Sequence, residues 1–143
     1  SDWAVHVGLA VDGVARVGAV ALPALGLVLR SDRPLPLPPC PVPPRMLVSR
    51  TRPAPQAAAL AATLGAVLLP MGSAGAKAMA VVRGEAEIYF HTGGQFEWDN
   101  CAPVAVAVAS GLHVSRVDGS PPRYNQPDPL LPDLLICHPN LAA

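Results

Sequence analysis

The chain has 143 residues, of which 51% are hydrophobic and only 14% charged, and its formal net charge is zero. A chain of this length can bury the core of one domain, and so apolar a composition excludes disorder over most of it. Without a basic excess, a nucleic acid polymer is not an expected partner. Stretches of about twenty residues are interrupted by Pro, Gly or charge, so we expect no membrane span and no membrane partner.

The cysteines and the N-terminus indicate the cell compartment. The sequence has three cysteines, Cys40, Cys101 and Cys137, which are widely spaced and form no CxxC pair. An odd number at such spacing argues against a disulfide framework or a zinc site. The first residues do not have the layout of a signal peptide. We therefore expect buried or incidental thiols in a cytoplasmic protein.

The first thirty residues predict three strands. Residues 3–11 are strand-like, and Asp12-Gly13 is a strong hairpin signal before a second strand at residues 15–22. A turn then leads to a third strand at residues 26–30, which gives an antiparallel meander. Because an open three-stranded sheet exposes a pairing edge, we interpret these strands as the continuation of a larger sheet whose other strands are not in this sequence.

Proline dominates the next segment. It occupies seven of the eleven positions from Pro34 to Pro44, a density that removes amide donors and imposes extended polyproline geometry. Residues 31–45 are therefore predicted to be a linker or surface loop. The alternative is a proline-rich ligand for a partner domain.

Beyond the loop, short strands alternate with helices, which predicts a sheet with helical crossovers and largely parallel pairings. Ligands in such sheets gather beyond the strand ends and at helix N-termini. The expected strands are residues 46–49, 66–70, 87–91, 113–116 and 134–137, and the expected helices are residues 56–64, 76–82 and a third that starts near Asp99.

The third helix carries an acidic residue at its start. Apolar residues from Val104 to Leu112 recur at helical spacing, Pro103 fits in or near the first turn, and Ser110-Gly111 is a plausible end. A carboxylate at Asp99 is favoured by the unpaired amides and the macrodipole, and it can hold a hard cation such as Mg²⁺. The alternative is that Asp99 only caps the helix.

A second helix start follows Gly72-Ser73. Small residues let the backbone approach an anion, and Ser73 and Lys77 can add a hydroxyl and a positive charge. The spacing is not that of a phosphate-binding GxxxxGK[ST] loop. The alternative is a helix cap followed by a solvated lysine.

Taken together, these motifs resemble the C-terminal signature of the inositol monophosphatase superfamily, and most closely the actinobacterial 3′(2′),5′-bisphosphate nucleotidases of the CysQ type. The resemblance covers nearly the whole chain, and the combination of the WD pair with the two longer motifs makes it specific. The motifs are WAVH at residues 3–6, GSAGAKAMAV at 72–81, GGQ at 93–95, EWDNCAP at 97–103, and DGSP with RYNQ at 118–126.

The resemblance implies an αβαβα layered fold and Mg²⁺-dependent hydrolysis of a phosphate monoester in a small-molecule substrate. By motif matching, Asp99 is a metal ligand, Ser73 and Ala74 line the substrate, and Lys77 meets a phosphate or ribose. His91 falls at a variable position that carries a specificity residue, so the choice of substrate stays open. Family members are often dimers, although nothing in these residues requires a homodimer.

The departures from the family pattern concern the metal ligands. An acidic motif and a DPxDGT motif, which supply the remaining carboxylates, do not occur here. Asp99 alone cannot hold two catalytic metals, and Glu97 points elsewhere on a helix. The chain therefore looks like the C-terminal half of such an enzyme, inactive alone, whose partner is the missing N-terminal half.

We thus expect three parts: strands at residues 1–30 that continue an absent sheet, a proline-rich loop at 31–45, and a C-terminal α/β subdomain at 46–143 with substrate and metal-ligand residues. The expected function of the complete protein is hydrolysis of 3′-phosphoadenosine 5′-phosphate. Inositol-1-phosphate or fructose-1,6-bisphosphate phosphatase activity is the alternative within enzymes, and a non-catalytic interaction module is the alternative outside them. Tyr124 and Asn125 fit either a nucleotide pocket or a polar turn.

Overall fold

The structure is a computed structural model that describes residues 2–142. Its first sheet is antiparallel, with the order β1-β2-β3. The strands are β1 (Val5–Val11), β2 (Val14–Leu22) and β3 (Leu27–Arg30). The hairpin that Asp12 and Gly13 predict is present, and both residues have the positive φ that such tight turns require. The predicted meander is confirmed.

The second sheet has five strands in the order β5-β4-β6-β8-β7. Three helices accompany it, and each matches a helix expected from the sequence. The strands are β4 (Arg45–Ser49), β5 (Val67–Met71), β6 (Ile88–Phe96), β7 (His113–Ser115) and β8 (Leu130–Cys137), and the helices are α1 (Ala57–Leu64), α2 (Ala74–Val82) and α3 (Glu97–Ala109). Residues 34–44 form no helix or strand, as their proline content predicts.

The expectation of largely parallel pairings is wrong for half of this sheet. β4 pairs in parallel with β5 and β6, whereas β8 pairs antiparallel with both β6 and β7. Helix α3 carries the chain from β6 to β7 but leaves a vacant position between them. The chain then returns from β7 through a loop without a helix, so the last strand fills that position in the opposite direction.

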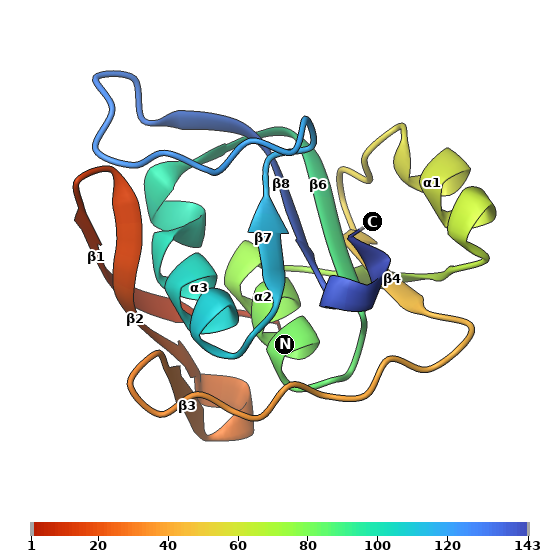
Figure 1. Cartoon of the computed structure of the whole chain (residues 1–143), viewed down its shortest axis with the longest axis horizontal. Coiled ribbons are helices and arrows are strands. Elements are labelled where there is room, and N and C mark those ends of the chain that lie inside the picture. Colours follow the sequence, from red (N-terminus) through yellow and green to blue (C-terminus); the bar gives the residue numbers. More distant parts are fainter. Residues whose placement is uncertain (1, 143) are drawn as a thin grey trace.

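The elements form four layers (Figure 1): the three-stranded sheet, then α2 and α3, then the five-stranded sheet, and finally α1. This arrangement corresponds to four consecutive layers of the expected αβαβα fold. One core cluster fills the space around α2 and α3, and a second lies between α1 and the five-stranded sheet. Within residues 2–142, no helix is long and apolar enough to cross a membrane.

Helix α3 packs unusually close to the first sheet, because two glycines face it. A Cβ added at Gly18 would lie 2.4 Å from the carbonyl oxygen of Ala102, and one added at Gly8 would lie 3.0 Å from the Ala102 amide nitrogen. Only residues without a side chain allow this approach. The β1–β2 pair therefore fixes the position of α3, and with it the position of Asp99.

The opposite face of the three-stranded sheet is apolar and exposed. Val7 is 71% exposed and Leu9 is 54% exposed, although both side chains are of a kind that normally faces a core. The exposed apolar side chains of β1 and β2 are Val5, Val7, Leu9, Val11 and Val17. Large contiguous patches of this kind mark surfaces that contact another element.

Helix α3 begins slightly earlier than its sequence suggests. It starts at Glu97, so Asp99 is its third residue, and Pro103 is the seventh rather than a residue of the first turn. A proline at this position removes the amide that would bond the carbonyl of Asp99. The predicted end is confirmed, since Ser110 caps the helix and Gly111 follows with a φ of 86°.

Candidate active site

All five site residues predicted from the sequence line one cavity of about 230 Å³, which we call the polar cavity. It lies where β4 and β5 end and where α2 and α3 begin, the place where such folds bind ligands. Its lining consists of Ser49, Thr51, Arg52, Gly72, Ser73, Ala74, Lys77, Tyr89, His91, Gly94, Gln95 and Asp99. The acidic helix start and the serine turn thus meet at one place, although the roles assigned to their residues stay predictions.

The turn before α2 holds Ser73 in a strained conformation. Its φ is 58°, in the left-handed region that a residue with a side chain rarely adopts. The Ser73 Oγ accepts a hydrogen bond from the amide of Ala76 at 3.2 Å, which caps the helix. Ser73 therefore caps α2, as the alternative interpretation expected. Ala74, the first residue of α2, lines the polar cavity.

Lys77 is not the solvated lysine of the alternative interpretation, because it is only 4% exposed. Its Nζ donates to the carbonyl oxygens of Ser73 at 3.1 Å and Met71 at 3.3 Å, and it lies 5.3 Å from the centre of the Tyr89 ring. Burial lowers the pKa of Lys77 from 10.5 to about 8. Since an ammonium has three N–H groups, one remains for a ligand in the cavity.

His91 is also buried, at 7% exposure. Its Nε2 lies 3.0 Å from the carbonyl oxygen of Gly94, and because a carbonyl only accepts, Nε2 carries the proton. Burial, the main cause, lowers the pKa of His91, so the neutral ring is favoured. In that form Nδ1 is an acceptor, which suits a hydroxyl or amino group of a ligand better than a phosphate.

Asp99 uses one carboxylate oxygen at the start of α3 and leaves the other without a partner in the described part of the chain. One carboxylate oxygen, Oδ2, accepts a hydrogen bond from the amide of Phe96 at 2.8 Å. This is the returning half of a capping box, made by the third residue of a helix. The other oxygen, Oδ1, has no hydrogen-bond partner among the described residues, so one oxygen remains for a ligand in the polar cavity.

The adjacent carboxylate of Glu97 points away, as expected from its helical position. Its two oxygens accept hydrogen bonds from the amides of Asn125 and Gln126, each at 2.9 Å. Glu97 therefore holds the loop after β7 against the start of α3 and is not part of the polar cavity. Tyr124 is buried at 1% exposure, and neither Tyr124 nor Asn125 lines the polar cavity.

The metal assignment can be tested against the donors present. Residues 2–142 contain no group of three or more His, Cys, Asp and Glu side chains that could hold a metal ion. Asp99 offers one carboxylate oxygen of the kind that Mg²⁺ prefers. The described residues thus fit a single ligand position of a cation site and not a complete site.

Sequence reasoning missed the loop that follows β4. Ser49, Thr51 and Arg52 line the polar cavity, and the amide of Arg52 donates to the Ser49 Oγ at 3.1 Å. Arg52 forms no ion pair within the described part of the chain, so its charge is available at the cavity. The signal was present, because polar residues directly after a parallel strand lie at the edge where ligands bind.

A buried chain of polar side chains runs beneath the cavity and was also missed. The Tyr124 hydroxyl donates to Asn100 at 2.7 Å, Asn100 donates to Gln95 at 3.0 Å, and Gln95 donates to the Tyr89 hydroxyl at 2.6 Å. Burial raises the pKa of both tyrosines, so they stay protonated. These hydrogen bonds join the end of β6 to the first turns of α3 and fix Asp99 relative to His91.

The chain belongs to the inositol monophosphatase family, whose sequence profile matches residues 1–143. It is 48% identical over 150 residues to a protein of Mycobacterium bovis named 3′-phosphoadenosine 5′-phosphate phosphatase, an alignment that covers 99% of this chain and 56% of the relative. A protein of the same name from Mycobacterium leprae is 45% identical over 162 residues, with 99% of this chain and 57% of the relative covered. The chain thus spans little more than half the length of these relatives.

Solved structures give the same fold. CysQ from Bacteroides thetaiotaomicron, described as a bacterial member of the inositol monophosphatase family, superposes with a TM-score of 0.82 at 22% identity and covers 96% of this chain and 63% of that chain. Inositol monophosphate-bound SaIMPase-II superposes with a TM-score of 0.77 at 18% identity, over 96% of this chain and 58% of that chain. These likenesses confirm the layered α/β architecture.

Proposed function

We propose that the chain forms the C-terminal part of a Mg²⁺-dependent phosphatase that removes a phosphate from a bisphosphate nucleotide such as 3′-phosphoadenosine 5′-phosphate. The observation that carries the proposal is the meeting of Asp99, Ser73 and Lys77 at one cavity. The names of the mycobacterial relatives support the substrate, since they share nearly half of the residues over the whole chain.

The donors of the polar cavity suit an anionic sugar phosphate. The remaining N–H of Lys77 and the guanidinium of Arg52 are charged donors for phosphate oxygens. The Nδ1 of His91 accepts from a hydroxyl or amino group, which orients the non-reacting part of the substrate. When bound, Mg²⁺ polarises the phosphate and activates a water, and Asp99 Oδ1 would be one of its ligands.

The remaining carboxylates would come from a segment outside this sequence. The exposed apolar face of β1 and β2 supports such a companion, because it is suited to pack against another layer. In this proposal the companion completes the αβαβα layers and the cation site together. The isolated chain is then inactive.

The test is reconstitution of phosphate release. The chain is mixed or co-expressed with an N-terminal segment of a mycobacterial relative, and release from 3′-phosphoadenosine 5′-phosphate is measured with and without Mg²⁺. We expect turnover only with both parts and Mg²⁺, abolished by Asp99→Asn and unchanged by Asp12→Asn in the remote β1–β2 hairpin. Unchanged turnover in Asp99→Asn would remove the metal assignment.

The same assay separates the alternatives. If phosphate is released faster from inositol-1-phosphate or fructose-1,6-bisphosphate, that compound and not the nucleotide would be the preferred substrate. Firm association of the two parts without any phosphate release would favour a non-catalytic module.

A further inference from the structure

The sequence from Arg33 to Pro41 favours polyproline II geometry. Every residue in it is either a proline or directly precedes one. Proline fixes its own φ, and it also pushes the preceding residue to extended or polyproline II angles. In the described structure the backbone of residues 34–43 makes no hydrogen bond, as expected for this conformation, which has no internal ones.

A polyproline II helix has three residues per turn, so residues three apart share an edge. Arg33, Pro36 and Pro39 form one such edge, and all three are exposed. On the two neighbouring edges, Pro38 and Cys40 are partly buried. We call Arg33, Pro36 and Pro39 the outer edge.

Contacts with the body fix which side of the segment faces outward. Leu37 lies against Gly111, whose added Cβ would be 4.0 Å from the Leu37 Cβ. Pro38 lies against Gly84, where an added Cβ would be 2.7 Å from the Pro38 Cβ. Because the segment is already ordered on the body, binding through the outer edge would cost little further conformational entropy.

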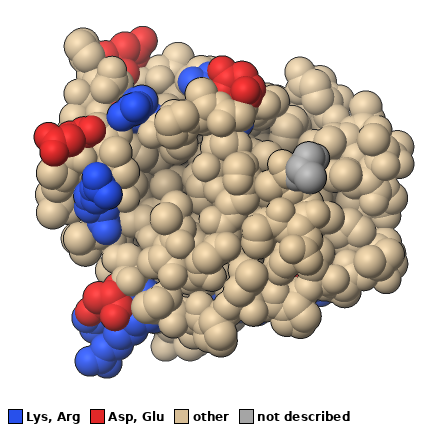
Figure 2. Space-filling model, viewed as in Figure 1, with Lys and Arg blue, Asp and Glu red and all other residues tan. Residues whose placement is uncertain are grey.

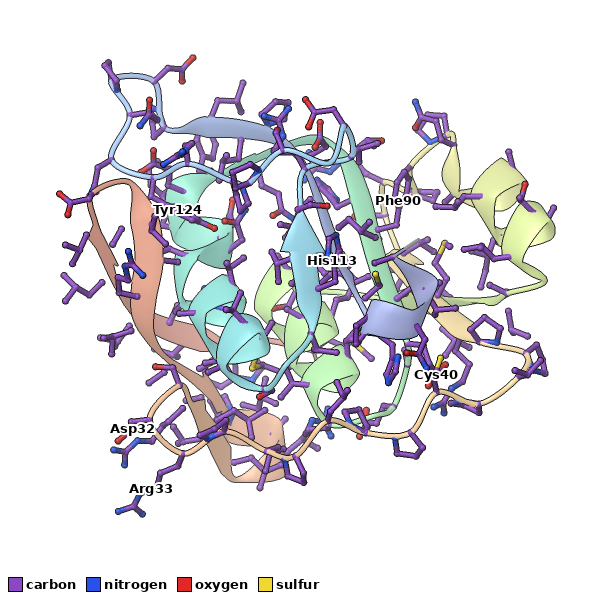
Figure 3. The ribbon with its side chains drawn as sticks, viewed as in Figure 1. Asp32, Arg33, Cys40, Phe90, His113 and Tyr124 are labelled. Carbon is purple, nitrogen blue, oxygen red and sulfur yellow. The ribbon has the colours of Figure 1, made fainter. Side chains whose placement is uncertain are left out.

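Arg33 gives this apolar edge a single charge at one end. No residue from 34 to 44 is charged, and among residues 2–142 Arg33 forms no ion pair, since Asp32 is paired with Arg30. Figure 3 shows the Arg33 side chain extending from the ribbon away from the rest of the molecule. In Figure 2 the charged side chains gather along the left of the face, and the surface to their right is uncharged.

We propose that Arg33 to Pro39 is a docking segment for a protein domain that reads polyproline II helices in an aromatic-lined groove and holds Arg33 in an acidic pocket, as SH3-type domains do. Recognition of PxxP segments exploits a preformed, low-entropy helix. The spacing Arg-x-x-Pro-x-x-Pro places the cation and both prolines on one edge. This inference does not depend on the phosphatase proposal.

The probe is a purified SH3 domain that binds Arg-x-x-Pro-x-x-Pro peptides, titrated into the full chain by calorimetry. We expect saturable binding, weakened about ten-fold or more by Pro36→Ala, Pro39→Ala or Arg33→Glu. The controls Pro34→Ala, off the outer edge, and Arg16→Glu, an exposed arginine on β2, should bind as the parent chain does. Because the outer-edge side chains are exposed and make no hydrogen bond in the described structure, we expect the variants to fold, and an unchanged circular dichroism spectrum will show it.

Two results would overturn the proposal. The first is no binding by the full chain at probe concentrations up to about 1 mM, even if a free peptide of residues 31–45 binds, because the fold would then hide the segment. The second is binding that the outer-edge variants leave unchanged. Asp99→Asn should bind the probe normally, which separates this inference from the phosphatase proposal.

Discussion

The ammonium of Lys77 donates to the carbonyl oxygen of Ser73 at 3.1 Å, and Ser73 is held at a φ of 58°. A buried cation therefore fastens the backbone of a strained turn. A strained residue persists only where its surroundings determine its conformation. Lys77 thus shapes the polar cavity even before it contacts a ligand.

The first prediction concerns the pH dependence of stability. The pKa of Lys77 falls from 10.5 to about 8 on folding, so between these values the unfolded chain binds the proton more than the folded chain does. The free energy of unfolding should then gain a contribution that rises from pH 8 to pH 10.5. Cysteines and tyrosines titrate in the same range, so the relevant quantity is the difference between the parent chain and Lys77→Met, measured by urea unfolding. Equal slopes in the two proteins would contradict the burial of this charge.

The second prediction tests the strain at Ser73. Ser73→Ala removes the Oγ that caps α2 and keeps a Cβ in the left-handed conformation, so it should destabilise the fold by about 1 kcal/mol. Ser73→Gly also loses the cap but relieves the strain, since glycine tolerates positive φ. We expect Ser73→Gly to be the more stable of the two by roughly 1 kcal/mol in urea unfolding. The reverse order would mean that the turn is not strained.

The third prediction concerns the buried polar chain. Tyr124→Phe leaves the Asn100 carbonyl oxygen buried without its donor, which should cost about 1–3 kcal/mol. Tyr89→Phe, at the other end, removes the acceptor of Gln95. If the four hydrogen-bonded side chains act as a unit, the double variant should lose less free energy of unfolding than the sum of the two single losses, with a coupling of at least about 0.5 kcal/mol. Additive losses in urea unfolding would show two independent hydrogen bonds.

The local sequence predicted most elements but not their full lengths. We expected the strand before α3 to end at His91, whereas β6 continues to Phe96. The register of β6 against β8 shifts between Thr92 and Gln95, so a bulge absorbs Gly93 and Gly94. Two glycines in a row normally indicate a turn, and only the pairing partner shows that they belong to a strand.

The last strand illustrates the same limit. We expected it to begin at Leu134, whereas β8 begins at Leu130 and includes Pro132. Pro132 lies opposite the bulge in β6, where the ladder is already interrupted, so its missing amide is tolerated. Such a position depends on which strands become neighbours, and no local pattern contains that information.

The sequence predicted the site residues that lie at helix starts. It did not predict the residues that come together only because distant segments pack against each other. The residues at the starts of α2 and α3 follow from local pattern and family resemblance. The hydrogen bond between Tyr124 and Asn100 joins residues 24 positions apart, and the place of Arg52 beside Lys77 depends on the parallel pairing of β4 with β5. The first has no short-range signal. The second has one, polar residues directly after a strand, but that signal does not show which strand becomes the neighbour.

The most direct test of the central claim is to locate a bound cation. Mn²⁺ can replace Mg²⁺ at oxygen ligands and broadens the NMR signals of nearby amides, so it is titrated into the chain assembled with its N-terminal companion. We predict broadening centred on Asp99 and the Ser73 turn that is lost in Asp99→Asn and retained in Asp12→Asn. Broadening that persists in Asp99→Asn, or that centres away from the polar cavity, would contradict the account.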